Sequence, residues 1–216
     1  MFVFLIPGPP RIDRDHVHRD KIWCRAGKSL KLEDVEVEGE PPAKVTWSFK
    51  DVKQDKWSWK NIKISQGSKP VDPEYYTTIL IENAERKQSG MYKIFAENEH
   101  GKDEEFVEVV FLGRPSPPLG PLEVYGVTQD SAKLNWRAPE DDGGRPIKKF
   151  IIEKMDMATK QWVPVGETPG DVTNIQAKGL EEGHEYLFRV KAVNDEGESE
   201  PLVADKAIKA KNAFGG

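Results

Sequence analysis

Apolar and polar residues alternate along short stretches in both halves of the 216-residue chain. The clearest apolar pairs, two residues apart, are Leu30 and Leu32, Val45 and Trp47, Ile79 and Ile81, Leu134 and Trp136, and Phe188 and Val190. A period of two is that of a β-strand with one buried face. The runs recur about every 8–12 residues between turn formers, and no window keeps the i, i+3, i+4 stripe of an amphipathic helix. The pattern predicts an all-β protein made of two antiparallel β-sandwiches in tandem.

One stretch in the first half changes phase. Leu30 and Leu32 share one face of the predicted strand, whereas Val35 and Val37 have the opposite parity. One inserted residue moves every later side chain to the other face of a sheet. We therefore expect a β-bulge near Glu33 and Asp34, which returns both valines to the core.

Proline and glycine concentrate in the stretch Gly-Arg-Pro-Ser-Pro-Pro-Leu-Gly-Pro at residues 113–121. Such a stretch is extended and poor in backbone donors, so it is a natural border between domains. The chain length also fits two domains of ordinary size. The predicted organisation is a flexible N-terminal segment at 1–10, a first domain at 11–113, a linker at 114–121, a second domain at 122–211 and a tail at 212–216.

Composition and charge narrow the class of protein. The formal net charge is −5, which argues against a nucleic-acid partner. The early apolar run from Met1 to Ile6 is far shorter than the ~20 residues that span a bilayer, so we expect neither a membrane contact nor a signal peptide. Cys24 is the only cysteine, and no asparagine begins a glycan acceptor. Both features favour the cytoplasm, where thiols stay reduced.

Four motifs stand out in the first half: Ala-Gly-Lys-Ser-Leu at 26–30, Gly-Glu-Pro-Pro-Ala-Lys-Val-Thr-Trp at 39–47, Ser-Gly-Met-Tyr at 89–92 and Ala-Glu-Asn-Glu-His-Gly at 96–101. Together they resemble an intermediate-set immunoglobulin domain. The resemblance implies that Trp47 fills the space between two sheets and that Tyr92 forms a tyrosine corner. It also implies that Val35 and Ile94 replace the two cysteines of the family, so packing substitutes for a bridge that contributes ~2–4 kcal/mol.

The second half contains a denser set of motifs: Leu-Asn-Trp at 134–136, Asp-Asp-Gly-Gly at 141–144, Leu-Glu-Glu-Gly at 180–183 and Phe-Arg-Val-Lys-Ala-Val-Asn at 188–194. They resemble a fibronectin type III domain, which implies core positions for Trp136, Leu180 and Tyr186. The proline-rich linker and the stretch Pro-Glu-Asp-Asp-Gly-Gly-x-Pro-Ile look most like the titin, twitchin and projectin family of giant muscle proteins, where the two modules alternate.

Two groups of residues are candidates for contact with a partner. Trp57 and Trp59 share one face of the predicted strand and are flanked by Lys56 and Lys60, and tryptophan beside lysine is a favoured hot-spot composition. The same rings could equally cover a sheet edge or touch the neighbouring domain. The other group is a basic cluster that comprises Arg145, Lys148 and Lys149. Instead of contacting a partner, these positive charges could be screened by the acidic residues 140–142.

The sequence contains no Gly-rich phosphate loop, nucleophile elbow, His-Glu-x-x-His pair or paired-cysteine metal site. We therefore expect no enzyme, no cofactor and no small-molecule substrate. His16 and His18 among aspartates could be read as a metal cluster, but a solvated entry segment is the preferred interpretation. Cys24 is expected to pack as a small hydrophobe, with an exposed thiol as the alternative.

The predicted function is that of a non-catalytic tandem that acts as docking surface, spacer and tension-bearing element. Tension is expected to load first the pairing of Ile22–Arg25 with Phe106–Phe111. The family resemblance implies a place in the A-band of the sarcomere, with the myosin thick filament as leading partner and other sarcomeric proteins as further partners. Two alternatives stay open, namely a fragment of an extracellular adhesion receptor and a segment that regulates a neighbouring kinase domain.

Overall fold

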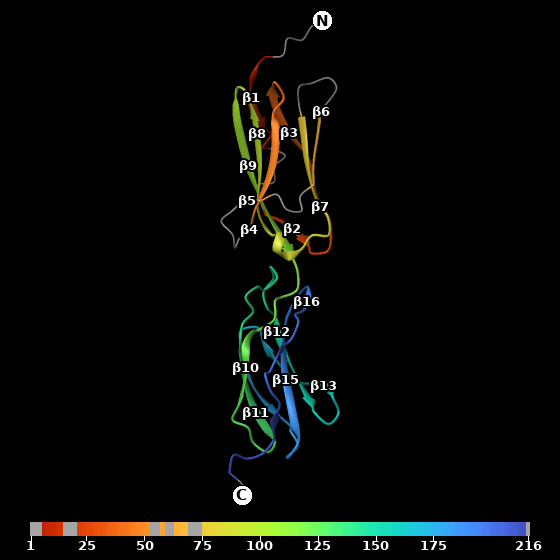
Figure 1. Cartoon of the computed structure of the whole chain (residues 1–216), viewed down its shortest axis with the longest axis vertical. Helices are drawn as coiled ribbons and strands as arrows, with labels where there is room; N and C mark the ends of the chain where they lie inside the picture. Colours follow the sequence, from red (N-terminus) through yellow and green to blue (C-terminus); the bar gives the residue numbers. More distant parts are fainter. Residues whose placement is uncertain (1–5, 15–20, 52–56, 59–62, 69–74, 215–216) are drawn as a thin grey trace. The chain divides into compact units, whose positions relative to one another are not determined.

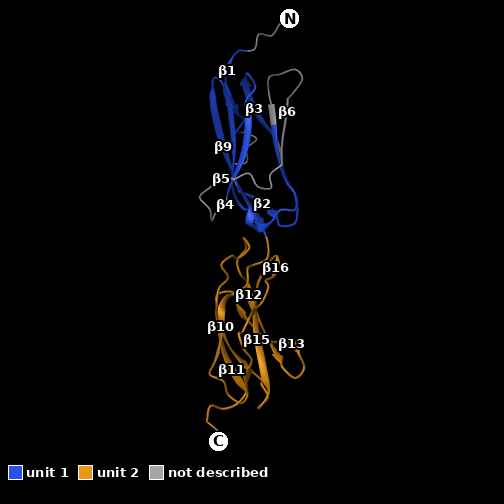
Figure 2. Ribbon diagram, in the orientation of Figure 1, with its two compact units in different colours: residues 1–112 blue, residues 113–216 orange. Residues whose placement is uncertain are grey.

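In the computed structural model the chain divides into two compact units, Met1–Leu112 and Gly113–Gly216 (Figures 1 and 2). The structure describes residues 6–14, 21–51, 57–58, 63–68 and 75–214. Over these ranges both units are built of strands, with a short 3-10 turn, η1, at Arg86–Gln88. The predicted all-β class with two β-sandwiches in tandem is confirmed.

Unit 1 has two facing sheets, with strand orders β1-β3-β7-β6 and β2-β9-β8-β4-β5. Its strands are β1 (Gly8–Ile12), β2 (Ile22–Arg25), β3 (Leu30–Glu40), β4 (Lys44–Asp51), β5 (Trp57–Ser58), β6 (Lys63–Ser68), β7 (Tyr75–Ile81), β8 (Gly90–Asn98) and β9 (Gly101–Leu112). Neighbours pair antiparallel except for β2, which runs parallel to β9. The interior between the sheets is apolar because alternate residues of each strand point inward.

The phase change in β3 is accommodated by an irregularity in its pairing with β7. Leu32 lies opposite Ile79 and Val35 lies opposite Thr77, so the register shifts between these two pairs. Both Val35 and Val37 are buried as a result. The predicted bulge near Glu33 and Asp34 is therefore confirmed, and its effect is to keep both halves of a long strand facing the core.

The N-terminal part of unit 1 differs from the expectation of a flexible segment at residues 1–10. Strand β1 begins at Gly8 and pairs with β3, with Gly8 opposite Glu40 and Arg11 opposite Glu38. The Asn98 side-chain amide donates a 2.9 Å hydrogen bond to the Gly8 carbonyl. Proline is tolerated on an edge strand, where the missing amide has no partner to lose, so a proline pair at positions 9 and 10 does not prevent pairing.

Unit 2 also has two sheets, with strand orders β10-β11-β14 and β13-β12-β15-β16. Two short strands, β17 and β18, pair with β15 beside this path. The strands are β10 (Leu119–Tyr125), β11 (Ser131–Arg137), β12 (Lys149–Asp156), β13 (Gln161–Pro169), β14 (Asn174–Lys178), β15 (Glu185–Asn194), β16 (Gly197–Glu198), β17 (Leu202–Val203) and β18 (Ile208–Lys209). Strand β10 thus begins inside the stretch 114–121 that the sequence pattern assigned to a linker.

Candidate interaction surfaces

The residues expected in the first core lie there. Trp47, Tyr92, Ile94 and Val35 all belong to the buried cluster of unit 1, and none is more than 4% exposed. The Tyr92 hydroxyl donates a 2.7 Å hydrogen bond to the Gln88 carbonyl in η1, and burial raises the pKa of this phenol. These side chains therefore belong to the core of unit 1.

The expected core residues of unit 2 are likewise buried. Trp136, Leu180 and Tyr186 are at most 5% exposed, and the Trp136 ring meets Phe150 edge-on at a centroid distance of 5.5 Å. The Tyr186 hydroxyl accepts a 2.9 Å hydrogen bond from the backbone amide of Glu181. Each unit therefore has a tyrosine whose hydroxyl ties a buried strand to the turn before it.

Most of the tryptophan–lysine group that is a candidate for partner contact lies outside the described ranges. This applies to Lys56, Trp59 and Lys60, and also to His16 and His18 of the possible metal cluster. The backbone of Trp57 is described in β5, where it lies opposite Lys50. The hypothesis that the two tryptophans contact a partner therefore stays a prediction.

The basic candidate on unit 2 is divided among different acidic partners. Lys148 Nζ lies 3.0 Å from Asp195, and Lys149 Nζ lies 2.9 Å from Glu167, while Arg145 is exposed. Lys149 opens β12, so its neighbours are set by β13 and β15 rather than by sequence proximity to residues 140–142. The two lysines still present positive charge on the surface, because these pairs are exposed and bind each other weakly.

An ordered group of charged and aromatic side chains covers the outer face of the large sheet of unit 2. We call it the ladder: Trp162 of β13, Glu153 of β12, Arg189 and Lys191 of β15, and Glu198 of β16. The Arg189 guanidinium lies 4.2 Å from the Trp162 ring centroid, which is a cation–π distance. Arg189 Nε and Lys191 Nζ approach the Glu153 carboxylate at 3.0 and 3.2 Å.

Three of the charged side chains of the ladder are largely shielded from solvent. The side chains of Glu153, Arg189 and Lys191 are only 14–20% exposed. Burial opposes ionisation of Glu153, but hydrogen bonds from Arg189 and Lys191 outweigh it and hold the pKa of this carboxyl below its usual value. These contacts restrain the side chains of the ladder relative to one another.

Sequence reasoning placed Arg189 and Lys191 only within a strand motif. A signal was present, because both alternate with the buried residues Phe188, Val190 and Ala192 and must therefore point outward. Their partner Glu153 is 36 residues away from Arg189, and only the β12–β15 register brings the two together.

A histidine lies between two carboxylates at the turn before β15. His184 Nδ1 is 2.6 Å from Asp156, and His184 Nε2 is 3.2 Å from Glu181. The hydrogen bond with Asp156 raises the pKa of His184, and the same bond lowers the pKa of Asp156. The His184 ring also stacks on Tyr186 at a centroid distance of 6.3 Å. When His184 is protonated, the site is a surface ion pair, and the raised pKa favours this protonated form.

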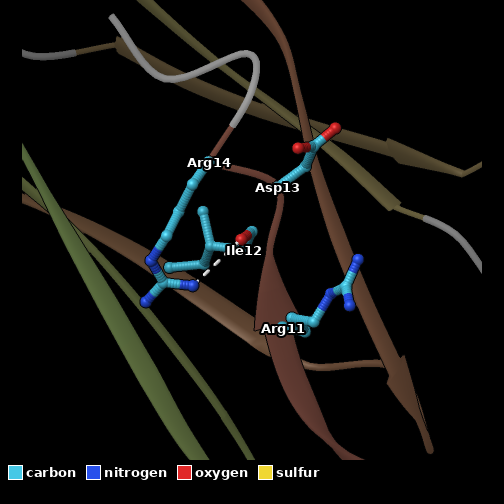
Figure 3. A pocket seen from close by; sticks show the side chains of 4 residues that line it. All are labelled: Arg11, Ile12, Asp13 and Arg14. Atoms are coloured by element: carbon cyan, nitrogen blue, oxygen red, sulfur yellow. Dashed lines mark hydrogen bonds between the residues drawn. The ribbon is translucent and has the colours of Figure 1, made fainter. Parts of the chain in front are cut away.

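A small pocket on unit 1 is lined by Arg11, Ile12, Asp13 and Arg14 (Figure 3). The Arg14 guanidinium turns back toward the Ile12 carbonyl, at 3.3 Å, and also binds Asp103 at 2.9 Å. Arg11 approaches Glu38 at 3.6 Å. Since both guanidinium groups have carboxylate partners, the pocket is an ion-paired part of the surface around β1.

The side chains of strand β2 point alternately into unit 1 and out to solvent. Its inward residues Ile22 and Cys24 pack against the core, and burial raises the pKa of the Cys24 thiol. Trp23 points the other way and is 54% exposed. Cys24 thus packs as a partly buried small hydrophobe, while Trp23 is a surface aromatic that the sequence pattern did not single out.

Neither a membrane-spanning helix nor a cluster of metal-binding side chains is found in the described ranges. Across those ranges there is no helix with the length and apolar character that a membrane crossing requires. The same ranges contain no group of three histidine, cysteine or acidic side chains that could hold a metal ion.

Both units match known domain families. A model of the immunoglobulin I-set domain matches residues 16–111, and a model of the fibronectin type III domain matches residues 116–205. The chain therefore belongs to both families, as an immunoglobulin I-set domain followed by a fibronectin type III domain. Its relatives are titin-like muscle proteins.

Three curated relatives extend over both domains. Titin of Drosophila melanogaster is 34% identical over 84% of this chain and 1% of that protein. Slow-type myosin-binding protein C of Homo sapiens is 34% identical over 92% of this chain and 17% of that protein. The titin homolog of Caenorhabditis elegans is 32% identical over 91% of this chain and 1% of that protein. The chain thus spans a small part of the length of these relatives.

Among solved structures, a multidomain segment of titin aligns with a TM-score of 0.49 and 26% identity. The alignment covers 94% of this chain and 67% of that chain.

Proposed function

We propose that this tandem is a non-catalytic structural and interaction module of a sarcomeric protein, located in the cytoplasm at the A-band. In this role it docks on the myosin thick filament, acts as a spacer and bears tension. Other sarcomeric proteins are further partners, and neither a cofactor nor a small-molecule substrate belongs to the function.

One observation carries the proposal. The similarity to slow-type myosin-binding protein C, whose name states what it binds, extends over 92% of this chain and includes both domains. Similarity to titins over 84–91% of the chain supports the same sarcomeric setting. A sheet face whose side chains already contact one another, such as the ladder, suits contact with a protein partner better than it suits chemistry on a small molecule.

The parallel pair β2–β9 supports the mechanical part. Tension enters β2 at its N-terminal end and leaves β9 at its C-terminal end, so it pulls two parallel neighbours in opposite directions. The bonds from the Ile22–Val109 pair to the Arg25–Leu112 pair then shear together rather than one at a time. The partner segment is Val109–Leu112, which only partly overlaps the expected Phe106–Phe111. Strand β1 precedes β2, so N-terminal tension reaches β1 before this pair.

Cosedimentation of the full chain with purified myosin filaments and, in parallel, with actin filaments tests the docking role. We expect the chain to pellet with myosin, to a lesser extent as ionic strength rises, and to stay in the supernatant with actin. Absence of the chain from the myosin pellet, or equal pelleting with both filaments, would contradict the proposal.

Matched variants then locate the contact. Trp57→Ala/Trp59→Ala is compared with Trp23→Ala, which removes an exposed tryptophan from another strand. Lys148→Glu/Lys149→Glu is compared with Lys133→Glu/Lys178→Glu, which reverses the charge of two exposed lysines on the small sheet of unit 2. If the sequence-predicted residues form the contact, the first member of each pair loses myosin pelleting and the second keeps it.

A further inference from the structure

The residues that precede β10 are bound to unit 2 at two points. We call residues 113–118 the strap. The Gly113 amide donates a 2.9 Å hydrogen bond to the Gly143 carbonyl, and the Ser116 amide donates one of 2.9 Å to the Asp141 carbonyl. The Ser116 hydroxyl in turn accepts a 3.0 Å bond from the Asp141 amide. The strap is therefore folded against the loop at 141–143.

A single buried side chain, that of Asn194, binds both the strap and the loop at 141–143. Asn194 is 3% exposed, and its Nδ2 donates to the carbonyls of Gly113, at 2.8 Å, and Asp142, at 2.7 Å. Its Oδ1 accepts from the amides of Glu196 and Gly197 at 2.8 and 3.2 Å. Both donors and the carbonyl of the amide are thus used, and Asn194 connects the strap, the loop and the turn after β15.

The packing around the strap is close. Gly143 has a φ of +80°, and a Cβ at this position would collide with the Gly113 carbonyl oxygen. Glycine is therefore required there both for its backbone conformation and for the approach of the strap. Pro115 and Pro118 are buried. The strap thus has one defined position rather than the freedom of a coil.

The strap is nevertheless held by few bonds. Three of its six residues are prolines, which have no amide N–H to donate, so the strap cannot form a continuous row of strand hydrogen bonds. Strand β10, which follows, pairs with β11 through consecutive partners from Glu123–Asn135 to Tyr125–Lys133. Under tension the separate hydrogen bonds of the strap are loaded one after another, whereas the consecutive backbone hydrogen bonds between two strands can share the load.

We propose that the strap is a mechanical latch, which detaches under tension as a separate step before the sandwich of unit 2 opens, and that Asn194 closes it. Release of six residues frees a contour of about 20 Å, and the gain in extension is this contour less the distance that the attached strap already spans, while the core of unit 2 stays folded. The mechanical use of the latch rests on the proposed function, whereas the latch itself is a property of the folded chain that needs no partner.

Amide hydrogen exchange of the full chain tests the latch in solution. Asn194→Asp keeps the acceptor for Glu196 and Gly197 but removes the donor to Gly113. We expect exchange at Gly113 and Ser116 to accelerate at least about tenfold, or about 1.4 kcal/mol, with the β15 core amides unchanged.

Asn135→Asp, at an exposed site in β11, is the matched control. Ser116→Ala is the second variant if Asn194→Asp does not fold. Unchanged strap exchange in the variant, or strap amides that open only together with the core, would overturn the latch.

Pulling single full-length chains in optical tweezers tests the mechanical step. We expect an extension shorter than the strap's contour of about 20 Å before unit 2 unfolds in the unmodified chain and in Asn135→Asp, its loss in Asn194→Asp, and its occurrence at lower force in Ser116→Ala, which loses only the bonds of the hydroxyl. A trace without this step in the unmodified chain, or with the step kept in Asn194→Asp, would refute the mechanical role. Neither readout involves myosin, so failure of the latch and failure of thick-filament docking are distinguishable.

Discussion

The indole Nε1 of Trp47 donates a 2.7 Å hydrogen bond to Oγ1 of Thr77, which joins β4 of one sheet to β7 of the other. Both side chains are fully buried. This bond connects the two sheets of unit 1 without a disulfide. Thr77 lies opposite Val35 and Trp47 lies opposite Ile94, the two positions that the family resemblance assigns to the missing cysteines.

Thr77→Val removes this bond at nearly constant volume. It leaves the buried indole N–H of Trp47 without its acceptor, so we expect the free energy of unfolding of unit 1 to fall by about 1–3 kcal/mol. Urea unfolding followed by NMR signals of unit 1 measures the change. Thr46→Val, on the outer face of β4, is the matched control and should cost less than about 1 kcal/mol. Equal effects of the two substitutions would contradict a special role for the Trp47–Thr77 bond.

Tyr92→Phe tests the tyrosine corner of unit 1. The substitution keeps the buried ring but removes the donor to the Gln88 carbonyl, so we expect a loss of about 1–2 kcal/mol in the stability of unit 1. Thermal unfolding monitored by the signals of this unit is a suitable measurement. Tyr125→Phe, at a site that is 49% exposed, should stay within about 0.5 kcal/mol of the unmodified chain. Wild-type stability in Tyr92→Phe would show that the ring alone fixes the corner.

Glu153 should make the stability of unit 2 sensitive to acid. Its pKa in the folded chain lies below the ordinary value of 4.5, so its ionised form favours the folded state. This contribution is present above pH 4.5 and is lost as the pH falls through the lower folded value. Glu153→Gln should therefore cost about 1–2 kcal/mol at pH 7, and the difference should shrink on acidification.

Urea titrations of the unmodified chain and of Glu153→Gln between pH 7 and about pH 3 give this comparison. Glu200→Gln, an exposed position in the same unit, serves as the matched control and should change stability by less than about 0.5 kcal/mol. A Glu153→Gln penalty that stays constant with pH would rule out ionisation of Glu153 as its cause.

His184 should titrate above its ordinary pKa of 6.5, because its hydrogen bond with the Asp156 carboxylate stabilises the protonated imidazole ring. A raised pKa in the folded state means that the stabilising contribution is complete below pH 6.5 and is lost as the pH rises through the folded value. Imidazole proton shifts in an NMR titration measure this pKa directly. Asp156→Asn should move it back toward 6.5, and an unchanged titration in that variant would show that Asp156 is not the cause.

The alternation of side chains along the sequence was sufficient to predict the all-β class, the bulge in β3 and the inward orientation of residues such as Trp47 and Trp136. These features are local, because the pleat of a strand sends successive side chains to opposite faces whatever the partner strand is. The motifs around Tyr92 and Tyr186 were equally readable, since each hydroxyl binds a backbone group only four or five residues away.

Contacts between distant segments could not be obtained in this way. The pairing of Glu153 with Arg189, the choice of Glu167 as partner of Lys149, the inclusion of β1 in a sheet and the attachment of the strap by Asn194 all depend on how strands far apart in sequence align. Register fixes which side chains become neighbours, and a shift of one residue would exchange them all. The sequence by itself therefore determined which side chains face the two cores, whereas tertiary structure alone decided which surface groups meet.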